Sequence, residues 1–261
     1  MSEKKISSRQ AFLLSLNVVL ATILLLVPSE VIKESGVNAW LAIIISGFIV
    51  APLHYLVFKL SCEFSNQNIV QDCIEVFVSI LGRIILLPFI LLNIELTILI
   101  IYESIGFIEF VMAGKQILGF WILVVLMGGY LSYKGLETII RVNLFGILIV
   151  ILSILLISFT SYNWIELARL KPLNLDFKRI IRGTLLPAHW FLIIPNLFLG
   201  FKPFFKDRFK VLKMSLIGNL VSQLLVSFLI MVTIGVFGSK LGGILENSFY
   251  PSINYCIFLG K

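Results

Sequence analysis

Long apolar runs without Asp, Glu, Lys or Arg recur along the whole chain. A helix needs about 20 such residues to cross the roughly 30 Å hydrocarbon core of a membrane. Six uncharged runs cover residues 11–29, 39–58, 117–133, 142–164, 183–201 and 214–239, and a seventh, residues 84–102, is interrupted only by Glu95. This pattern predicts about seven transmembrane helices, numbered here one to seven in chain order.

The composition also favours a membrane protein. Hydrophobic residues make up 59% of the 261 residues and charged residues 13%, which would leave a soluble domain too little polar surface. The sequence has no phosphate loop, nucleophile elbow or zinc motif, and its three cysteines lack metal-ligand spacing. We therefore expect an all-α membrane protein that is not an enzyme, holds no cofactor or metal, and binds no nucleic acid.

Basic residues predict the orientation, because Lys and Arg are enriched in the cytoplasmic loops of membrane proteins. With a cytoplasmic N-terminus, twelve of the 21 Lys and Arg residues lie inside, including the cluster at residues 202–213. The loop at residues 169–182 is an exception, since it places five basic residues outside. We expect a cytoplasmic N-terminus, basic loops that contact anionic lipid headgroups, and an interfacial position for His54.

Two segments outside the apolar runs suggest internal symmetry. Residues 69–81 repeat apolar side chains at helical spacing, which predicts an amphipathic helix on the cytoplasmic face. Residues 241–253 have a similar mixed character and would lie on the outer face. Two surface segments on opposite sides, each after the second helix of its group, indicate an inverted repeat.

Helices one and six would be equivalent in such a repeat, and both carry signs of irregularity. Pro187 and Pro195 each remove a backbone donor from helix six, so we expect a break there, with His189 between them. Helix one carries Asn17 and Thr22 in an otherwise apolar run. These residues indicate a similar break, although fewer residues point to it than in helix six.

Four short stretches of the sequence are distinctive: ISSRQ at residues 6–10, LVPS at 26–29, NAWL at 38–41 and KGLE at 134–137. With the hydropathy pattern of the whole chain, they resemble the B subunit of the nutrient germinant receptors of spore-forming bacteria. That family is placed in the amino acid/polyamine/organocation transporter superfamily, whose LeuT-type fold has two inverted five-helix repeats. The resemblance implies a first repeat at residues 1–164 and part of a second at 165–261, an incomplete 5+5 arrangement in one transmembrane domain.

The resemblance also implies a ligand site near the bilayer midplane, where helices one, three and six converge. Its candidate residues are Asn17, Ala21, Thr22, Glu95, Pro187 and His189. Glu95 could bind an amine or a proton there, or pair with a hydroxyl or with His189, because an intramembrane carboxylate is costly unless it faces protein or water. His189 could instead be an interior histidine with its own partners, and Asn17 and Thr22 could cap a broken helix.

The sequence departs from the family in two places. Family members usually have small residues, often a glycine pair around a threonine, where helix one unwinds, whereas this chain has Leu20, Ala21, Thr22 and Ile23. They typically have ten helices, and Lys261 falls in the segment before helix eight. We therefore expect the chain alone, without helices eight to ten or a partner subunit, to bind no amino acid with useful affinity.

The expected function is that of a germinant receptor subunit in the cell membrane or the spore inner membrane. It would sense a small nutrient, such as an amino acid, through a shift in the population of helix arrangements. The resemblance implies an A-type membrane subunit and a C-type lipoprotein as partners. The alternatives are a secondary transporter of amino acids, which the fold alone does not exclude, and a truncated, non-functional paralogue.

Overall fold

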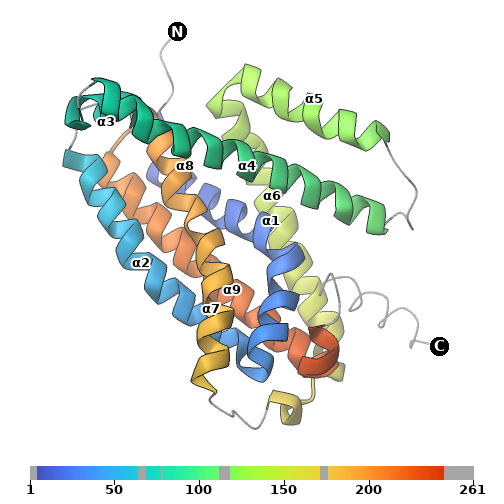
Figure 1. The fold of residues 1–261 in the computed structure, drawn as a ribbon. Helices are drawn as coiled ribbons and strands as arrows, with labels where there is room; N and C mark the ends of the chain where they lie inside the picture. Colours follow the sequence, from blue (N-terminus) through green and yellow to red (C-terminus); the bar gives the residue numbers. More distant parts are fainter. Residues whose placement is uncertain (1–4, 64–68, 78, 112–117, 171–175, 244–261) are drawn as a thin grey trace.

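The computed structural model describes residues 5–63, 69–77, 79–111, 118–170 and 176–243. Nine α-helices lie in these residues: α1 (Ser8–Ser35), α2 (Ala39–Glu63), α3 (Ile69–Phe77), α4 (Ser79–Val111), α5 (Leu118–Lys134), α6 (Leu136–Ser161), α7 (Phe177–Phe191), α8 (Ile193–Phe201) and α9 (Arg208–Gly242). Short 3-10 helices cover Gly36–Asn38, Tyr162–Trp164, Leu167–Leu170 and Lys202–Phe204. The described part of the chain contains no β-strand, so the fold is all-α (Figure 1).

Five ranges are long and apolar enough to cross a membrane: Val27–Leu60, Ile80–Ile108, Leu136–Trp164, Phe177–Phe204 and Arg208–Gly242. The first of them runs from α1 through the turn at Gly36 into α2. Two shorter apolar stretches, Ser8–Leu24 and Gly119–Lys134, are helical as well. Each of the seven predicted runs therefore falls on a helix, or on two helices for helix six, and the prediction of an all-α membrane protein is confirmed.

Four helices, α1, α2, α7 and α9, pack around the main hydrophobic core. Leu20, Ile43, Phe191 and Ile230, one from each of these helices, are completely buried in it. Burying such aliphatic and aromatic side chains against one another gives close van der Waals packing, which holds helices together within a lipid environment. α9 has the most buried apolar stretch of the candidate spans, so it forms the centre of the bundle.

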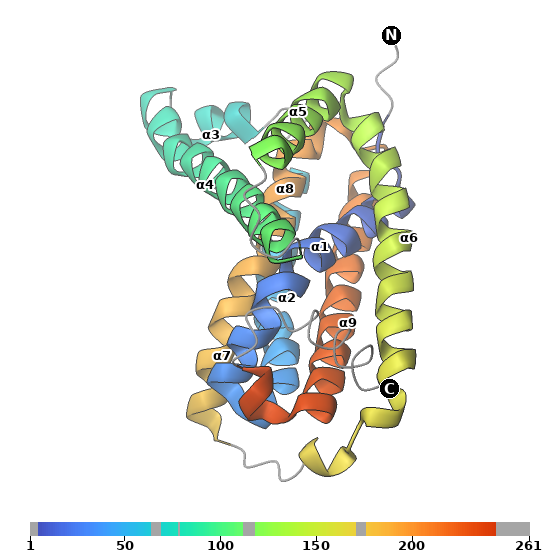
Figure 2. The ribbon, with the colours of Figure 1, turned by 90° about the vertical axis from the view of Figure 1, so that its right-hand side faces the viewer.

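The helices α4, α5 and α6 lie at the periphery of this core (Figures 1 and 2). Ile80, Leu126 and Phe145, from α4, α5 and α6 in that order, are large and exposed. Contiguous exposed apolar surface of this kind is rare on soluble proteins. Lipid is therefore the environment that these three helices fit.

Gly218 allows α9 to approach α1 closely. A Cβ atom at this position would lie 2.6 Å from the carbonyl oxygen of Phe12 and 3.0 Å from the Cβ of Ser15. Small residues at helix contacts permit such close backbone approach in membranes. The close contact between α1 and α9 thus depends on glycine, which has no side chain, at position 218.

We expect Gly218→Ala to lower the free energy of unfolding by about 1–3 kcal/mol, because the added methyl group forces α1 and α9 apart. Gly200→Ala in α8 is the matched control, since a Cβ there would meet no described neighbour within 4 Å. The control should be neutral or stabilising by up to about 1 kcal/mol, from helix propensity alone. Thermal unfolding in detergent measures both, and equal effects would contradict the close packing of α1 and α9.

α1 remains helical from end to end but changes direction midway along its length (Figure 1). Pro28 lies inside the helix and cannot donate a backbone hydrogen bond. The Thr22 hydroxyl donates to the carbonyl oxygens of Val18 (2.8 Å) and Val19 (3.3 Å), a type of contact that often bends helices. Helix one is therefore bent rather than broken, and the expectation of a break is corrected to a bend.

The segments predicted to share the cytoplasmic face do lie together. The Ile6 amide donates to the Phe204 carbonyl at 2.7 Å, and the Lys206 amide donates to the Ile6 carbonyl at 3.1 Å. Asp72 of α3, on the predicted amphipathic segment, pairs with Lys202 of the same loop. The helix predicted between runs two and three is confirmed over Ile69–Phe77.

The segments predicted to lie outside meet at the other end of the bundle (Figure 2). The Glu166 amide donates to the Gly235 carbonyl at 3.1 Å, and the Ser35 hydroxyl donates to the Arg179 carbonyl at 3.2 Å. Residues 244–253 of the second predicted surface segment lie outside the described residues. These contacts agree with the predicted grouping for the loops they join, Lys115 lies outside the described residues, and the cytoplasmic location of the N-terminus stays a prediction.

Candidate functional site

Helix six is broken, as predicted, into α7 and α8 with Leu192 between them. Pro195 stands where an unbroken helix would donate an amide hydrogen to the carbonyl of Phe191, and proline has none. That carbonyl instead accepts a hydrogen bond from the Nδ2 of Asn219 on α9, at 3.2 Å. The break is therefore stabilised by a side chain from another helix, as a backbone group in a membrane requires.

Asn219 belongs to a buried polar cluster under the break. Its Nδ2 lies 3.5 Å from Nδ1 of His54 on α2, whose Nε2 lies 3.2 Å from the Ser215 hydroxyl on α9. His54 is only 1% exposed, so its side chain lies inside the bundle, while its interfacial depth stays a prediction. Proximity to a predicted helix end indicated an interface, but α9 supplies polar partners that allow the imidazole to be buried.

A cavity of about 330 Å³ lies between α4 and the two halves of helix six. Its lining consists of Pro88, Phe89, Leu92 and Leu96 from α4 and of His189, Leu192, Ile193 and Asn196 from the region of the break. Six of these eight side chains are apolar. The volume falls in the range of small-molecule sites, which are mostly apolar with a few polar groups that fix orientation.

An amide pair beside the cavity joins α8 to α4. The Nδ2 of Asn196 donates to Oδ1 of Asn93 at 3.1 Å, and the Nδ2 of Asn93 donates to the Phe89 carbonyl at 2.8 Å. Asn196 lines the cavity and is half-buried, while His189 is exposed at its rim. The arrangement offers a hydrogen-bonding amide and an imidazole beside an apolar surface.

The structure places the six predicted ligand residues in different surroundings. Pro187 is buried in α7 one turn before the break, and His189 lines the cavity. Glu95 is exposed on α4 and does not line this cavity, and its ligand-binding role stays a prediction. Hydropathy fixes the depth of a residue in the membrane, but not the side of the helix it occupies.

The three predicted residues of α1 lie away from this cavity. The Nδ2 of Asn17 donates to Oδ1 of Asn143 on α6 at 2.6 Å, which joins two helices. Thr22 bonds within its own helix, and Ala21 is exposed. None of the three lines the cavity at the break, and their ligand-binding role stays a prediction.

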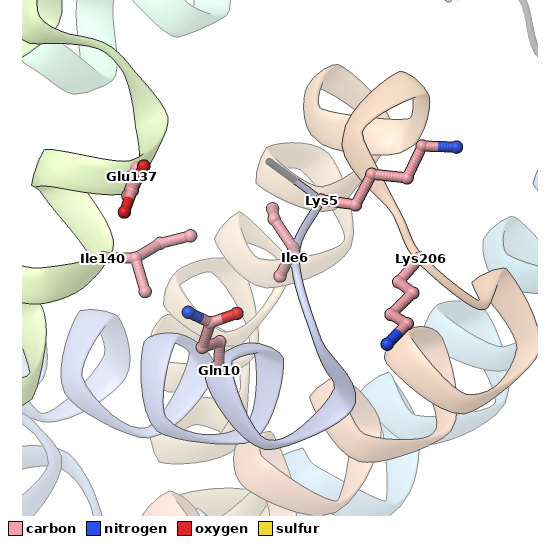
Figure 3. Close-up of a pocket in the computed structure, with 6 residues that line it drawn as sticks. All are labelled: Lys5, Ile6, Gln10, Glu137, Ile140 and Lys206. Atoms are coloured by element: carbon pink, nitrogen blue, oxygen red, sulfur yellow. The ribbon is translucent and has the colours of Figure 1, made fainter. Parts of the chain in front are cut away.

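A second cavity of about 380 Å³ lies at the N-terminal end of the molecule, where the charged loops meet. Figure 3 shows its lining residues, Lys5, Ile6, Gln10, Glu137, Ile140 and Lys206. Two of its polar groups already have partners, since Glu137 pairs with Arg141 at 2.6 Å and the Gln10 side chain accepts from the Ser7 amide at 2.9 Å. The cavity at the helix break is the better candidate for a ligand site.

Four polar residues near the break were not among the predicted site residues: His54, Asn93, Asn196 and Asn219. A signal for them exists in the sequence, because each is a polar residue within an apolar run. In α9 the signal is periodic, since Ser215, Asn219, Ser222, Gln223 and Ser227 lie on one face and are all buried. Intramembrane polar residues that repeat at helical spacing indicate a helix contact or a site.

Comparison with known proteins gives one match. The family model described as spore germination protein, named for a spore permease, matches residues 5–255, nearly the whole chain. No curated protein and no solved structure matches the chain significantly. This all-α membrane protein with a broken sixth helix therefore belongs to the spore germination protein family.

Proposed function

We propose that the chain is a nutrient-sensing subunit of a germinant receptor and that it binds a neutral amino acid with an apolar side chain. The observation that carries the proposal is the cavity between α4 and the broken helix, because it combines an apolar wall with the Asn196 amide and the His189 imidazole. The apolar wall suits the side chain of such a ligand. The two polar groups suit its carboxylate and ammonium groups.

The break supplies a means of response. Broken helices in membrane transporters carry their ligand sites where the chain departs from helical geometry. A ligand that contacts both α4 and α8 favours those arrangements in which the two helices lie at the right separation. The mechanism is a shift in population, limited by the difference in affinity between the arrangements.

Other parts of the proposal rest on the family resemblance. They are the LeuT-type inverted repeat, the A-type membrane and C-type lipoprotein partners, and a site in the spore inner membrane. The cytoplasmic N-terminus rests on the charge of the loops, which the fold groups at one end of the bundle. The proposals that the chain binds a small nutrient and acts as a receptor subunit rest on the cavity.

Ligand-induced stabilisation of the purified chain tests the proposal. L-Leucine, L-valine and L-alanine, titrated against the chain in lipid nanodiscs, should include one that raises the unfolding midpoint saturably. At a concentration 100 times the Kd, the expected stabilisation is about 2.7 kcal/mol. D-Enantiomers are the control, since the cavity is chiral and the Asn196 amide is held by Asn93. The absence of any shift would contradict the proposal and agree with the expectation that further helices are needed.

Transport is the second candidate, because the family model is named for a permease. The stabilising amino acid, radiolabelled, should bind to the chain in proteoliposomes without accumulating inside them if the chain only senses. Accumulation that depends on the chain would instead establish a transporter that uses the same cavity.

A further inference from the structure

A buried ion pair connects the end of the broken helix to the surface helix α3. Lys202 begins the 3-10 turn that follows α8, and its ammonium donates to Oδ2 of Asp72 at 2.6 Å. The Lys202 side chain is 1% exposed and that of Asp72 13%, whereas the other ion pairs of the described residues are much more exposed. This pair is an interior contact, and Lys202 is not one of the loop lysines that reach the lipid headgroups.

α3 and α4 form one unit next to this pair. A Cβ atom at Gly82 in α4 would lie 2.6 Å from the backbone oxygen of Cys73 in α3, so the two backbones are in close contact. α8 is joined to this unit at two points, through Asn196 to Asn93 and through Lys202 to Asp72. The two points lie about 9 Å apart along the chain direction of α8, given the helical rise per residue.

At its other end, α8 is separated from α7 by the break at Leu192. At its far end, α8 is held by the buried charge pair together with other contacts, since Phe198 is completely buried and the Phe204 carbonyl accepts from the Ile6 amide at 2.7 Å. Separating the ammonium from the carboxylate is costly, because it leaves a buried charge without its counter-ion. The pair therefore helps to fix the end of α8 against α3.

We propose that the Lys202–Asp72 ion pair is a latch that fixes the end of α8 to α3, so that a displacement of α8 at the cavity moves α3. The latch itself requires no ligand, whereas its use in signalling rests on the proposed function. α3 becomes the element through which the broken helix acts on the surface of the protein at the N-terminal end of the bundle (Figure 1).

Amide hydrogen exchange of residues 69–77, in the chain held in nanodiscs, tests the latch. A nine-residue helix is too short to be stable alone, so its exchange reports how firmly it is held. Asp72→Asn and Lys202→Gln should each raise the exchange rate on the order of 100-fold, because removing one partner of a buried pair is strongly destabilising. Lys206→Gln, in the same loop but exposed, is the matched control and should change nothing.

The decisive test is a double variant, Asp72→Lys with Lys202→Asp, which exchanges the two charges. It should restore most of the protection that the single variants lose, if pairing of the two charges holds α3. Unchanged exchange in both single variants, or an equal rise in Lys206→Gln, would overturn the latch. A wild-type chain that shows the latch but no amino-acid stabilisation would contradict the proposed function alone, so the two failures are distinguishable.

Discussion

Replacing Asn219 with leucine is expected to lower the free energy of unfolding by about 1–3 kcal/mol, the cost of leaving a buried acceptor unsatisfied. The acceptor is the Phe191 carbonyl, which receives the Asn219 Nδ2 at 3.2 Å because Pro195 has no amide hydrogen to offer. Leucine has the same number and branching of side-chain heavy atoms as asparagine, although it is larger, and it has no donor. The same change would also remove the contact of Asn219 with His54.

A second substitution distinguishes loss of the hydrogen bond at the break from a general disruption of packing. Pro195→Ala restores an amide that can donate to the Phe191 carbonyl and continue the helix. Asn219→Leu should therefore cost much less in the Pro195→Ala background than in the wild type, a non-additive result that a double-mutant cycle detects. Asn163→Leu, at an exposed position, is the control and should be close to neutral.

Unfolding of the four variants in detergent, followed by circular dichroism, gives the two costs. Equal costs of Asn219→Leu in the two backgrounds would mean that Asn219 does not serve the carbonyl freed by Pro195. The break would then have another origin.

The helices of this fold follow closely from the sequence, because the membrane imposes a length and a composition on each span. The break in helix six could be predicted for the same kind of reason, since Pro195 and Pro187 remove backbone donors wherever the chain folds. Pro28 in helix one produced only a bend, and α1 stays helical around it. The effect of a proline thus depends on which neighbouring groups are present, which a single sequence does not show.

The site was harder to predict, because polar side chains in the bundle pair with residues far along the chain. Asn17 bonds to Asn143, 126 positions away, and Asn93 bonds to Asn196, 103 positions away. An asparagine in an apolar run indicates that some partner exists, but its identity depends on helix packing. For the same reason Asn17 was interpreted as a ligand group, whereas the structure gives it an interhelical partner.

Charged residues illustrate the same limit. Glu95 is the only acidic residue of its apolar run, and that rarity made it a candidate although it lies on the exposed side of α4. Lys202 was one of a basic cluster at residues 202–213, and only the fold shows that its side chain is buried against Asp72. Counting charges placed the N-terminal segment and the loop at residues 202–206 on the same side, and these two do lie together, because that rule needs no knowledge of individual contacts.

Photolabelling with a diazirine analogue of leucine is the most direct test of where the chain binds its nutrient. We expect the label on residues 88–96 of α4 and residues 189–196 across the break, because these residues line the cavity. Excess L-leucine should reduce this labelling to background, since both molecules compete for one cavity of about 330 Å³.

Two tryptophan variants give this measurement its specificity. Leu92→Trp places a larger side chain in the cavity and should abolish the labelling, and the exposed position of Leu92 leaves room for the fold to tolerate it. Leu126→Trp, on the exposed surface of α5 and away from the cavity, should leave the labelling unchanged. Competed labelling of both segments that is lost only in Leu92→Trp is the predicted result. Labelling spread over the lipid-facing helices, or unaffected by Leu92→Trp, would contradict a ligand site at the broken helix.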